Sequence, residues 1–414
     1  MKKIVLSVYL FLIAAFCVSS QSFQTQIINK NIQTLQLKAS NDFNMPVIRL
    51  NSDDVLEISF DELSHDSKYY GYEVLHCNAD WTLSPTEFSE NLIPDVISLG
   101  EMSFNTTVQY THYRFYLPNE NIRFKFSGNY VLKIYENNDP DDLIAIARFS
   151  IVDARINIEG KVRSNTDTEI NGAMQQLDFY IYPNNYTIQD AYRELKIAVF
   201  QNRRLDNAVS DLQPTYISRD KLSYINNRAL IFEGGNEYRG FDFSSVYTYS
   251  ENIEQISYKK PYYNVELAND RIAPRVPYTH LRDANGRYVI NLQRSRYPDT
   301  EADYAFVYFT LPTEQPFFDG AVYLLGDINH NLLDNEARMF YNSQRKAYEK
   351  VFLLKQGGYN YQYVFQAKGS KAASAARIGG SHWQTENEYA IFVYHRPFGE
   401  RYDKLIGVEI VNSR

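Results

Sequence analysis

The chain has 414 residues, of which 44% are apolar and 22% charged, ordinary values for a folded globular protein that exclude disorder as its main state. Its 50 acidic and 42 basic residues give a net charge of −8, which excludes nucleic acid as a partner because phosphate binding requires clustered lysine and arginine. The 35 tyrosines and 25 phenylalanines indicate β-structure, because aromatic side chains suit pleated, half-buried surfaces.

The beginning of the chain is predicted to be a secretory signal peptide, residues 1–20. Two lysines precede the apolar run 4–16, and two serines close the segment. The run is too short to span a bilayer, and no later stretch is long and apolar enough for a transmembrane helix. Phe16 is bulkier than the residue that usually precedes a lipidated cysteine, which disfavours lipid attachment at Cys17.

Cleavage of this signal would leave Cys77 as the single cysteine. An exported protein with one cysteine has no internal disulfide, so packed cores must supply its stability. The lysine-containing signal and the lack of disulfides favour a bacterial envelope over a eukaryotic secretory route.

Residues alternate with period two along most of the chain, which predicts strands. We expect an all-β protein with three consecutive immunoglobulin-like β-sandwich domains. The first domain, 22–155, ends in a hairpin whose strands flank an acidic turn at 137–142. The second, 156–295, has long loops. The third, 299–414, contains an aromatic strand around 359–365.

An outer-membrane barrel is the alternative architecture, because its strands also alternate and are rich in tyrosine. Barrel strands have about ten residues and an apolar outer face. Here many predicted strands are shorter and carry charges on both faces, and the chain ends at 411–414 without an aromatic strand. The pattern therefore favours sandwiches.

Motifs for metal binding or catalysis are weak. His76 and Cys77 are adjacent on a predicted strand and face opposite sides, which favours a hydrogen-bonded histidine and a buried thiol. The segment 327–331 resembles the start of a calcium loop, but Leu332 and Arg338 replace the required glycine and glutamate. No nucleophile elbow, zinc-protease or phosphate-loop motif is present. We therefore expect no enzyme activity, catalytic residue, metal or cofactor.

A glycine-rich loop at 233–240 is the most distinctive irregular segment. Its glycines permit close backbone approach, and its polar and aromatic side chains offer recognition groups. A wide turn with solvated charges is an equal alternative. The candidate partner-binding residues are Gly234, Gly235, Asn236, Glu237, Tyr238 and Arg239.

Several stretches together resemble the type IX secretion system plug proteins. They are 72–81, 107–113, 127–130, 232–242 and 300–304. The similarity covers nearly the whole mature chain. The signature residues in these stretches, which we expect to be structural, are His76, Asn78, Asp80, Trp81, Tyr113, Gly128, Asn129 and Tyr130.

The resemblance implies a non-enzymatic protein of the periplasm, peripherally associated with the outer membrane. It implies that the protein binds the periplasmic mouth of the β-barrel translocon and seals the idle pore. On its own, the protein is expected to be a monomer. The glycine-rich loop is the candidate contact with the translocon.

A second resemblance gives the alternative function. Residues 322–327, 339–341 and 354–361 of the third domain resemble glycogen- and starch-binding sandwich modules, which implies a glycan-binding envelope protein. Such modules usually present paired exposed tryptophans, whereas Trp383 is the single tryptophan in this domain.

Overall fold

The computed structural model describes residues 23–414, and the predicted signal peptide lies outside them. Strands dominate this part of the chain, and its helical elements are single turns. The prediction of an all-β protein built from sandwiches is confirmed. The helical turns are η1 (Thr86–Phe88), α1 (Ala191–Glu194), η2 (Arg228–Leu230), α2 (Pro298–Glu301), η3 (Asp327–Asn329) and α3 (Ala376–Gly379).

The first sandwich is formed by the N-terminal strands. These are β1 (Gln26–Ile27), β2 (Ile32–Ala39), β3 (Val47–Arg49), β4 (Leu56–Glu62), β5 (Tyr70–Cys77), β6 (Asn91–Ile97), β7 (Glu101–Met102), β8 (Thr111–Leu117), β9 (Gly128–Glu136) and β10 (Leu143–Val152). One sheet has the order β1-β10-β9-β5-β6, with β3 parallel to β10, and the other has the order β2-β4-β8-β7. The hairpin expected at the end of this unit is formed by β9 and β10.

The middle sandwich combines strands from two distant parts of the chain. These are β11 (Asn157–Arg163), β12 (Met174–Tyr182), β13 (Leu195–Gln201), β14 (Val209–Ser210), β15 (Tyr216–Ile217), β16 (Leu222–Tyr224), β17 (Ile231–Glu233), β27 (Glu388–His395) and β28 (Lys404–Asn412). One sheet has the order β11-β12-β16-β15, with β17 beside β12. The other has the order β14-β13-β27-β28.

This pairing differs from the predicted split into 156–295 and 299–414. The last two strands belong to a sheet of the middle sandwich, because β27 pairs with β13 from Leu195↔His395 to Gln201↔Tyr389. Alternate residues of β13 are buried, so the strand lies against the core of the middle sandwich. Its backbone N–H and C=O groups therefore need hydrogen-bond partners on both edges of the strand, and the short β14 covers only one edge. The C-terminal strands supply the partners on the other edge.

The third sandwich is inserted between the two parts of the middle one. Its strands are β18 (Arg239–Asp242), β19 (Ile253–Lys259), β20 (Tyr262–Leu267), β21 (Tyr288–Ile290), β22 (Tyr304–Pro312), β23 (Gly320–Leu325), β24 (Phe340–Asn342), β25 (Ala347–Lys355) and β26 (Gly357–Ala367). One sheet has the order β18-β26-β21, with β23 also on β26, and the other has the order β19-β20-β22-β25-β24.

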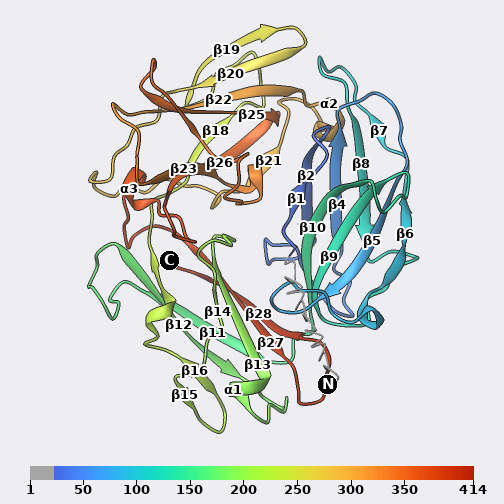
Figure 1. The fold of residues 1–414 in the computed structure, drawn as a ribbon, viewed down its shortest axis with the longest axis vertical. Helices are drawn as coiled ribbons and strands as arrows, with labels where there is room; N and C mark the ends of the chain where they lie inside the picture. Colours follow the sequence, from blue (N-terminus) through green and yellow to red (C-terminus); the bar gives the residue numbers. More distant parts are fainter. Residues whose placement is uncertain (1–22) are drawn as a thin grey trace, which may run out of the picture.

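Each sandwich has its own apolar core, and the three sandwiches surround a common centre. In Figure 1 the first lies at the right, the third at the upper left, and the middle one at the lower left with β27 and β28 in red. A smaller cluster, which includes Val47, Phe392 and Leu405, joins the first sandwich to the middle one. Another, with Val108, Tyr110 and neighbours, joins the first to the third.

Candidate functional site

His76 is fixed inside the first sandwich by contacts on every side of its ring. Nδ1 lies 2.8 Å from Ser84 Oγ, and Nε2 lies 3.2 Å from the carbonyl oxygen of Ser127. The ring packs edge-on against Tyr130, with centroids 4.9 Å apart. Burial lowers the pKa of His76 to about 4, so the ring is neutral at neutral pH. A neutral, fully bonded histidine has a structural role.

Asn78 and Asn129 lie at the contact between the first and middle sandwiches, which we call the lower seam. The Oδ1 atom of Asn78 accepts a hydrogen bond from Arg396 Nη2 (2.5 Å), and Asn129 Oδ1 accepts one from the Tyr394 hydroxyl (2.9 Å). Both donors belong to the C-terminal part of the chain. The signature residues therefore hold the first sandwich against strands that the sequence analysis assigned to another domain.

Asp403 is the charged centre of the lower seam. Its buried carboxylate accepts from the backbone amide of Ala79 (2.9 Å) and from Arg396 Nε (2.8 Å). Lys196 Nζ lies 3.0 Å from Asp403 Oδ2. These bonds satisfy a carboxylate that would otherwise be costly to bury.

The remaining signature residues also have partners within the chain. Asp80 is exposed, and its Oδ1 accepts from the hydroxyl of Thr82. Trp81 stacks under the Arg148 guanidinium, 4.3 Å from the ring centroid. The buried Tyr113 hydroxyl accepts from the backbone amide of Lys68 at 2.9 Å.

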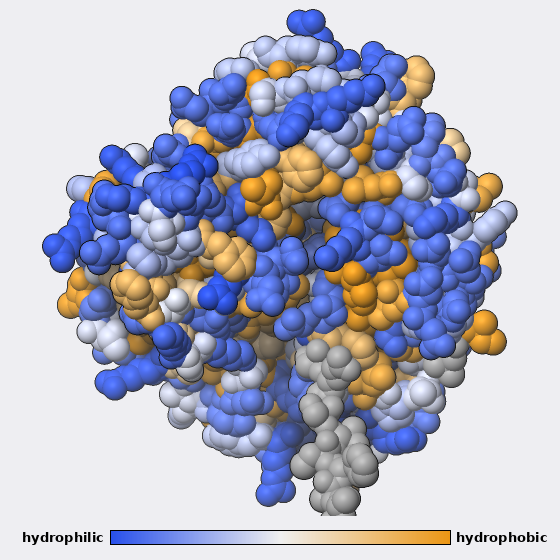
Figure 2. All heavy atoms as spheres, turned by 45° about the horizontal axis from the view of Figure 1, so that its top comes forward, coloured by the Kyte–Doolittle hydropathy of each residue, from blue (hydrophilic) through white to orange (hydrophobic). Residues whose placement is uncertain are grey.

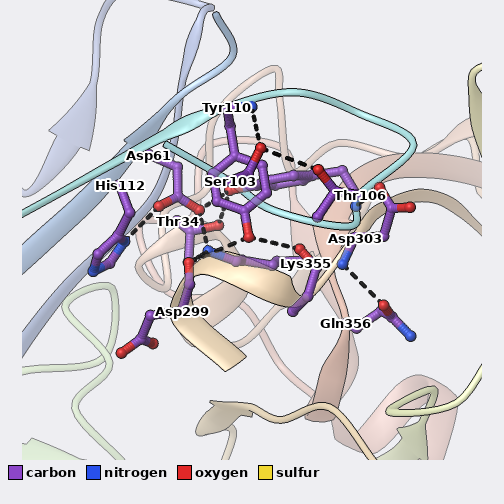
Figure 3. A network of polar contacts seen from close by, with 12 residues as sticks. Thr34, Asp61, Ser103, Thr106, Tyr110, His112, Asp299, Asp303, Lys355 and Gln356 are labelled. Carbon is purple, nitrogen blue, oxygen red and sulfur yellow. Dashed lines mark hydrogen bonds and ion pairs between the residues drawn. The ribbon is translucent and has the colours of Figure 1, made fainter. Parts of the chain in front are cut away.

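Two further family-like stretches, 107–113 and 300–304, meet at the contact between the first and third sandwiches, which we call the upper seam. The Asp303 carboxylate accepts from the amide of Thr107 (2.8 Å), the hydroxyl of Thr107 (2.6 Å) and the amide of Val108 (3.0 Å). The Tyr110 hydroxyl donates to the carbonyl of Ala302 at 2.8 Å. Figure 3 shows Tyr110 of the first sandwich and Asp303 of the third within this seam.

An ion pair between Asp61 and Lys355 lies at the centre of the upper seam (Figure 3). Lys355 Nζ is 2.5 Å from Asp61 Oδ2, and both side chains are 1% exposed. The Tyr304 hydroxyl donates to the same carboxylate at 2.6 Å, and His112 Nδ1 lies 2.6 Å from Asp61 Oδ1. Sequence reasoning did not identify this set, because Asp61 and Lys355 are 294 positions apart.

Opposite effects of burial and charge act on this pair. Burial alone would raise the pKa of the Asp61 carboxyl, but Lys355 and His112 hold it below its ordinary value. Burial lowers the pKa of Lys355, and the Asp61 carboxylate opposes that shift. The pair is thus mutually stabilised but has no exposed atom with which to act on a substrate.

The glycine-rich loop connects the middle and third sandwiches. A Cβ atom on Gly234 would lie 2.1 Å from the carbonyl oxygen of His382, so only glycine fits there. The amide of Gly235 donates to Ser381 Oγ (3.0 Å), and Asn236 Nδ2 donates to the carbonyl of Gly379 (2.8 Å). These bonds join the loop to the end of α3 and to the segment that follows it.

Two side chains of this loop, those of Glu237 and Tyr238, are buried and cannot take part in the expected partner contact. Tyr238 is 4% exposed and its hydroxyl accepts from Gln362 Nε2, while the buried Glu237 accepts from the Tyr278 hydroxyl. Burial raises the pKa of the Glu237 carboxyl. Arg239 Nε pairs with Asp270 at 2.9 Å. Because the packed third sandwich covers Glu237 and Tyr238, these two side chains offer no surface to a partner.

The other residues singled out from the sequence show no reactive arrangement. Cys77 is buried and free. Within residues 23–414, no group of histidine, cysteine, aspartate or glutamate could hold a metal ion, and no helix is long and apolar enough to cross a membrane. Trp383 is half-buried beside the middle sandwich, where its carbonyl accepts from Gln175 Nε2, rather than on a face of the third sandwich.

The most exposed apolar segment of the first sandwich is 91–104, which we call the β6–β7 edge. Strand β6 ends one sheet and β7 ends the other, so this one segment lies along an open edge of both sheets. Ile93 is 82% exposed and Phe104 64% exposed. The exposed apolar side chains of the segment are Ile93, Val96, Leu99, Met102 and Phe104. Soluble proteins usually protect apolar sheet edges, so this segment has the character of an interaction surface.

Comparison with known proteins gives two informative matches. The model of the family described as type 9 secretion system plug protein 1st domain matches residues 32–153, which span β2 to β10. The solved structure of a hypothetical protein from Parabacteroides merdae is 44% identical, with 95% of this chain and 100% of that chain covered and a TM-score of 0.92.

A second solved structure is too dissimilar to indicate a shared fold. It is the solved structure of Pseudomonas fluorescens alkylpurine DNA glycosylase AlkC bound to DNA containing an abasic site analog, with 12% identity, 29% of this chain and 30% of that chain covered, and a TM-score of 0.18. No curated protein matches the chain.

The family match and the structure concern the same part of the molecule. The matched range contains the signature residues from His76 to Tyr130, the first-sandwich side of both seams and the β6–β7 edge. The first sandwich of this chain is therefore the first domain of the type 9, or type IX, secretion system plug protein family.

Proposed function

We propose that this protein is a non-enzymatic plug that binds the periplasmic mouth of the outer-membrane type IX translocon barrel and seals its pore when idle. The observation that carries the proposal is the match of the first sandwich to the plug family, which is not a family of enzymes. In this proposal the protein acts in the periplasm, as a monomer bound peripherally to the outer membrane.

The construction of the molecule supports this function, because a plug must keep its shape across a wide opening. Asp403 at the lower seam and the Asp61–Lys355 pair at the upper seam fix the first sandwich to both others. Such buried polar contacts hold one relative orientation, since any displacement would leave a charge buried without its partner. The molecule can therefore act as one rigid body.

The β6–β7 edge is the surface that we assign to the translocon. Its apolar side chains lie along open sheet edges, where an extended partner segment can add backbone hydrogen bonds and cover the side chains. Stable interfaces bury about 1,200–2,000 Å² in total, so this edge would form the apolar centre of a larger contact. We prefer this edge to the glycine-rich loop as the contact, because Glu237 and Tyr238 of that loop are buried.

A quantitative pull-down tests both the partner and the surface. The tagged protein is isolated from detergent-solubilised outer membranes, and co-purifying proteins are measured by mass spectrometry. We expect a very large β-barrel protein at near-equal amount. The double substitution Ile93→Asp and Leu99→Asp should lower its recovery at least about tenfold, because central apolar contacts contribute most of the binding energy.

Phe398→Asp is the matched control, since Phe398 is 97% exposed on a loop of the middle sandwich. It should leave recovery unchanged. Isolation of the protein alone, or with proteins that handle polysaccharides, would contradict the plug function and favour the glycan-binding alternative. Normal recovery with the double variant would contradict the assignment of the edge alone.

A further inference from the structure

A cavity of about 380 Å³ lies where the three sandwiches meet. Its wall includes parts of β2 and the segment 44–47 from the first sandwich, the end of β13 from the middle one, and the η3 turn from the third. Figure 2 shows the surface hollowed near this junction, with apolar side chains beside the hollow. The cavity exists only when the three sandwiches are assembled.

The charges on the wall are mostly positive. They belong to Lys38, Arg148, Arg203, Arg287 and Asp327, which are four cations and one carboxylate. Burial lowers the pKa of Arg148 only to about 10, so this side chain is charged at neutral pH. The whole chain carries a net charge of −8, so the sign of this wall is opposite to that of the molecule.

Lys38 and Arg203 have hydrogen-bonding capacity that the chain does not use. Lys38 is exposed and has no ion pair among residues 23–414. Arg203 Nη2 donates to the carbonyl of Asn285 (3.0 Å) and lies 3.2 Å from Asp327 Oδ1. Its Nη1 has no hydrogen-bond partner within the described part of the chain. A guanidinium fixed by one nitrogen, with the other available, is preorganised to bind an anion.

Arg287 differs from these two cations. Its Nη2 donates to both carboxylate oxygens of Glu388, at 2.7 and 2.8 Å. This pair connects the third sandwich to the middle one, so Arg287 shapes the wall instead of offering a donor. The anion-binding capacity is therefore concentrated on Lys38 and Arg203.

The rest of the wall is largely apolar and aromatic. Half-buried side chains that line it are Leu37, Met45, Trp81, Phe200, Leu205 and Tyr288. A cavity with a few fixed polar groups and an apolar lining is the usual form of a small-molecule site, and its volume lies within the range of roughly 300–1,000 Å³ found for such sites.

We propose that this cavity binds a small amphiphilic anion, a molecule with one acidic group on an apolar body. The acidic group lies against Lys38 and Arg203, and the apolar body lies against Leu37, Met45 and Phe200. This binding is additional to the proposed plug function. Because the ligand would contact both the first and the middle sandwich, its binding would also stabilise their arrangement.

Calorimetric titration of the mature full-length protein tests the proposal. The probes are decanoate and decyl phosphate, with 1-decanol as the neutral molecule of the same chain length, all below their aggregation concentrations. We expect saturable binding of at least one acid with one site per chain, and binding of 1-decanol at least about tenfold weaker. The comparison of the two acids shows whether carboxylate or phosphate is preferred.

Two variants locate the site. Lys38→Gln and Arg203→Gln should each weaken binding of the preferred acid about tenfold or more, because hydrogen bonds to a charged group are strong. Lys38→Gln leaves folding intact, since Lys38 is exposed and unpaired. Lys371→Gln, at an exposed lysine outside the cavity wall, is the control and should bind as the unaltered protein does.

Three results would overturn the proposal: no saturable binding of either acid, equal binding of 1-decanol, or unaltered affinity in both variants. Translocon recovery with Lys38→Gln should remain normal in the pull-down. Failure of the anion site can therefore be distinguished from failure of the plug function.

Discussion

Several signature residues of the first sandwich are held in place by hydrogen bonds to buried polar side chains. Asn129 shows this most clearly, since its Oδ1 accepts from both Ser150 Oγ (2.8 Å) and the Tyr394 hydroxyl (2.9 Å). A buried group that loses its partners costs about 1–3 kcal/mol, so such residues constrain the structure strongly. We therefore propose that these residues hold the sandwiches together rather than contact a partner.

Gly128, next to Asn129, has no room for a larger side chain. Its φ is +147°, and an added Cβ would lie 2.3 Å from His76 Nε2 and 3.1 Å from the carbonyl oxygen of Asp403. We expect Gly128→Ala to lower the free energy of unfolding by about 2–4 kcal/mol, which combines backbone strain with overpacking. Urea unfolding followed by tyrosine fluorescence measures this change.

Gly369→Ala separates the two causes. Gly369 has φ +80°, but no heavy atom lies within 4 Å of an added Cβ, so this substitution should cost only about 1–2 kcal/mol of backbone strain. Equal losses at the two glycines would show that the contact with His76 is unimportant.

At the scale of elements, the upper seam depends on one lysine of β25. Lys355→Met would leave the Asp61 carboxylate of β4 buried without its cation. We expect a loss of about 3–5 kcal/mol in the free energy of unfolding, measured by urea denaturation. The double variant Lys355→Met/Asp61→Asn should lose less than the single variant, because it removes the buried charge.

Lys346→Met provides the comparison for Lys355→Met. Lys346 also pairs with a carboxylate, Glu314, at 2.6 Å, but this pair is exposed to solvent. Exposed pairs contribute about 0–1 kcal/mol, so the control should change little. A loss at Lys355 no larger than at Lys346 would mean that the buried pair does not hold the seam.

Local patterns in the sequence were sufficient to predict the strands, but not to predict which distant strands pair with each other. Alternation predicted the all-β class and the hairpin of β9 and β10, because strand periodicity and turn chemistry act over a few residues. The pairing of β13 with β27 has no local signal. The polar residues of the glycine-rich loop suggested a surface, whereas Glu237 and Tyr238 become buried when two sandwiches pack together.

For the whole molecule, we expect the stability of the fold to decrease in acid, because the buried His76 stays neutral in the folded protein. The pKa of His76 is about 4 in the folded protein and about 6.5 when unfolded. Between these values the unfolded state binds more protons, so the free energy of unfolding falls as the pH is lowered through this window. The contribution of His76 amounts to about 3 kcal/mol.

Denaturation profiles between pH 7 and pH 4 test this expectation. His76→Gln should have a smaller dependence on pH than the unaltered protein, whatever its stability at pH 7. Burial also lowers the pKa of His330 and of His382, so some dependence will remain. Parallel profiles for the variant and the unaltered protein would show that His76 does not titrate differently on folding.

The discontinuous middle sandwich has a consequence for the timing of folding during export. A chain that emerges from its N-terminus can complete the first sandwich early, because β1 to β10 pair only among themselves. The sheet with β13 stays open until β27 and β28 emerge about 200 residues later. The cavity and the lower seam close last, so a prematurely ended chain would lack both and would expose apolar surface to the quality control of the envelope.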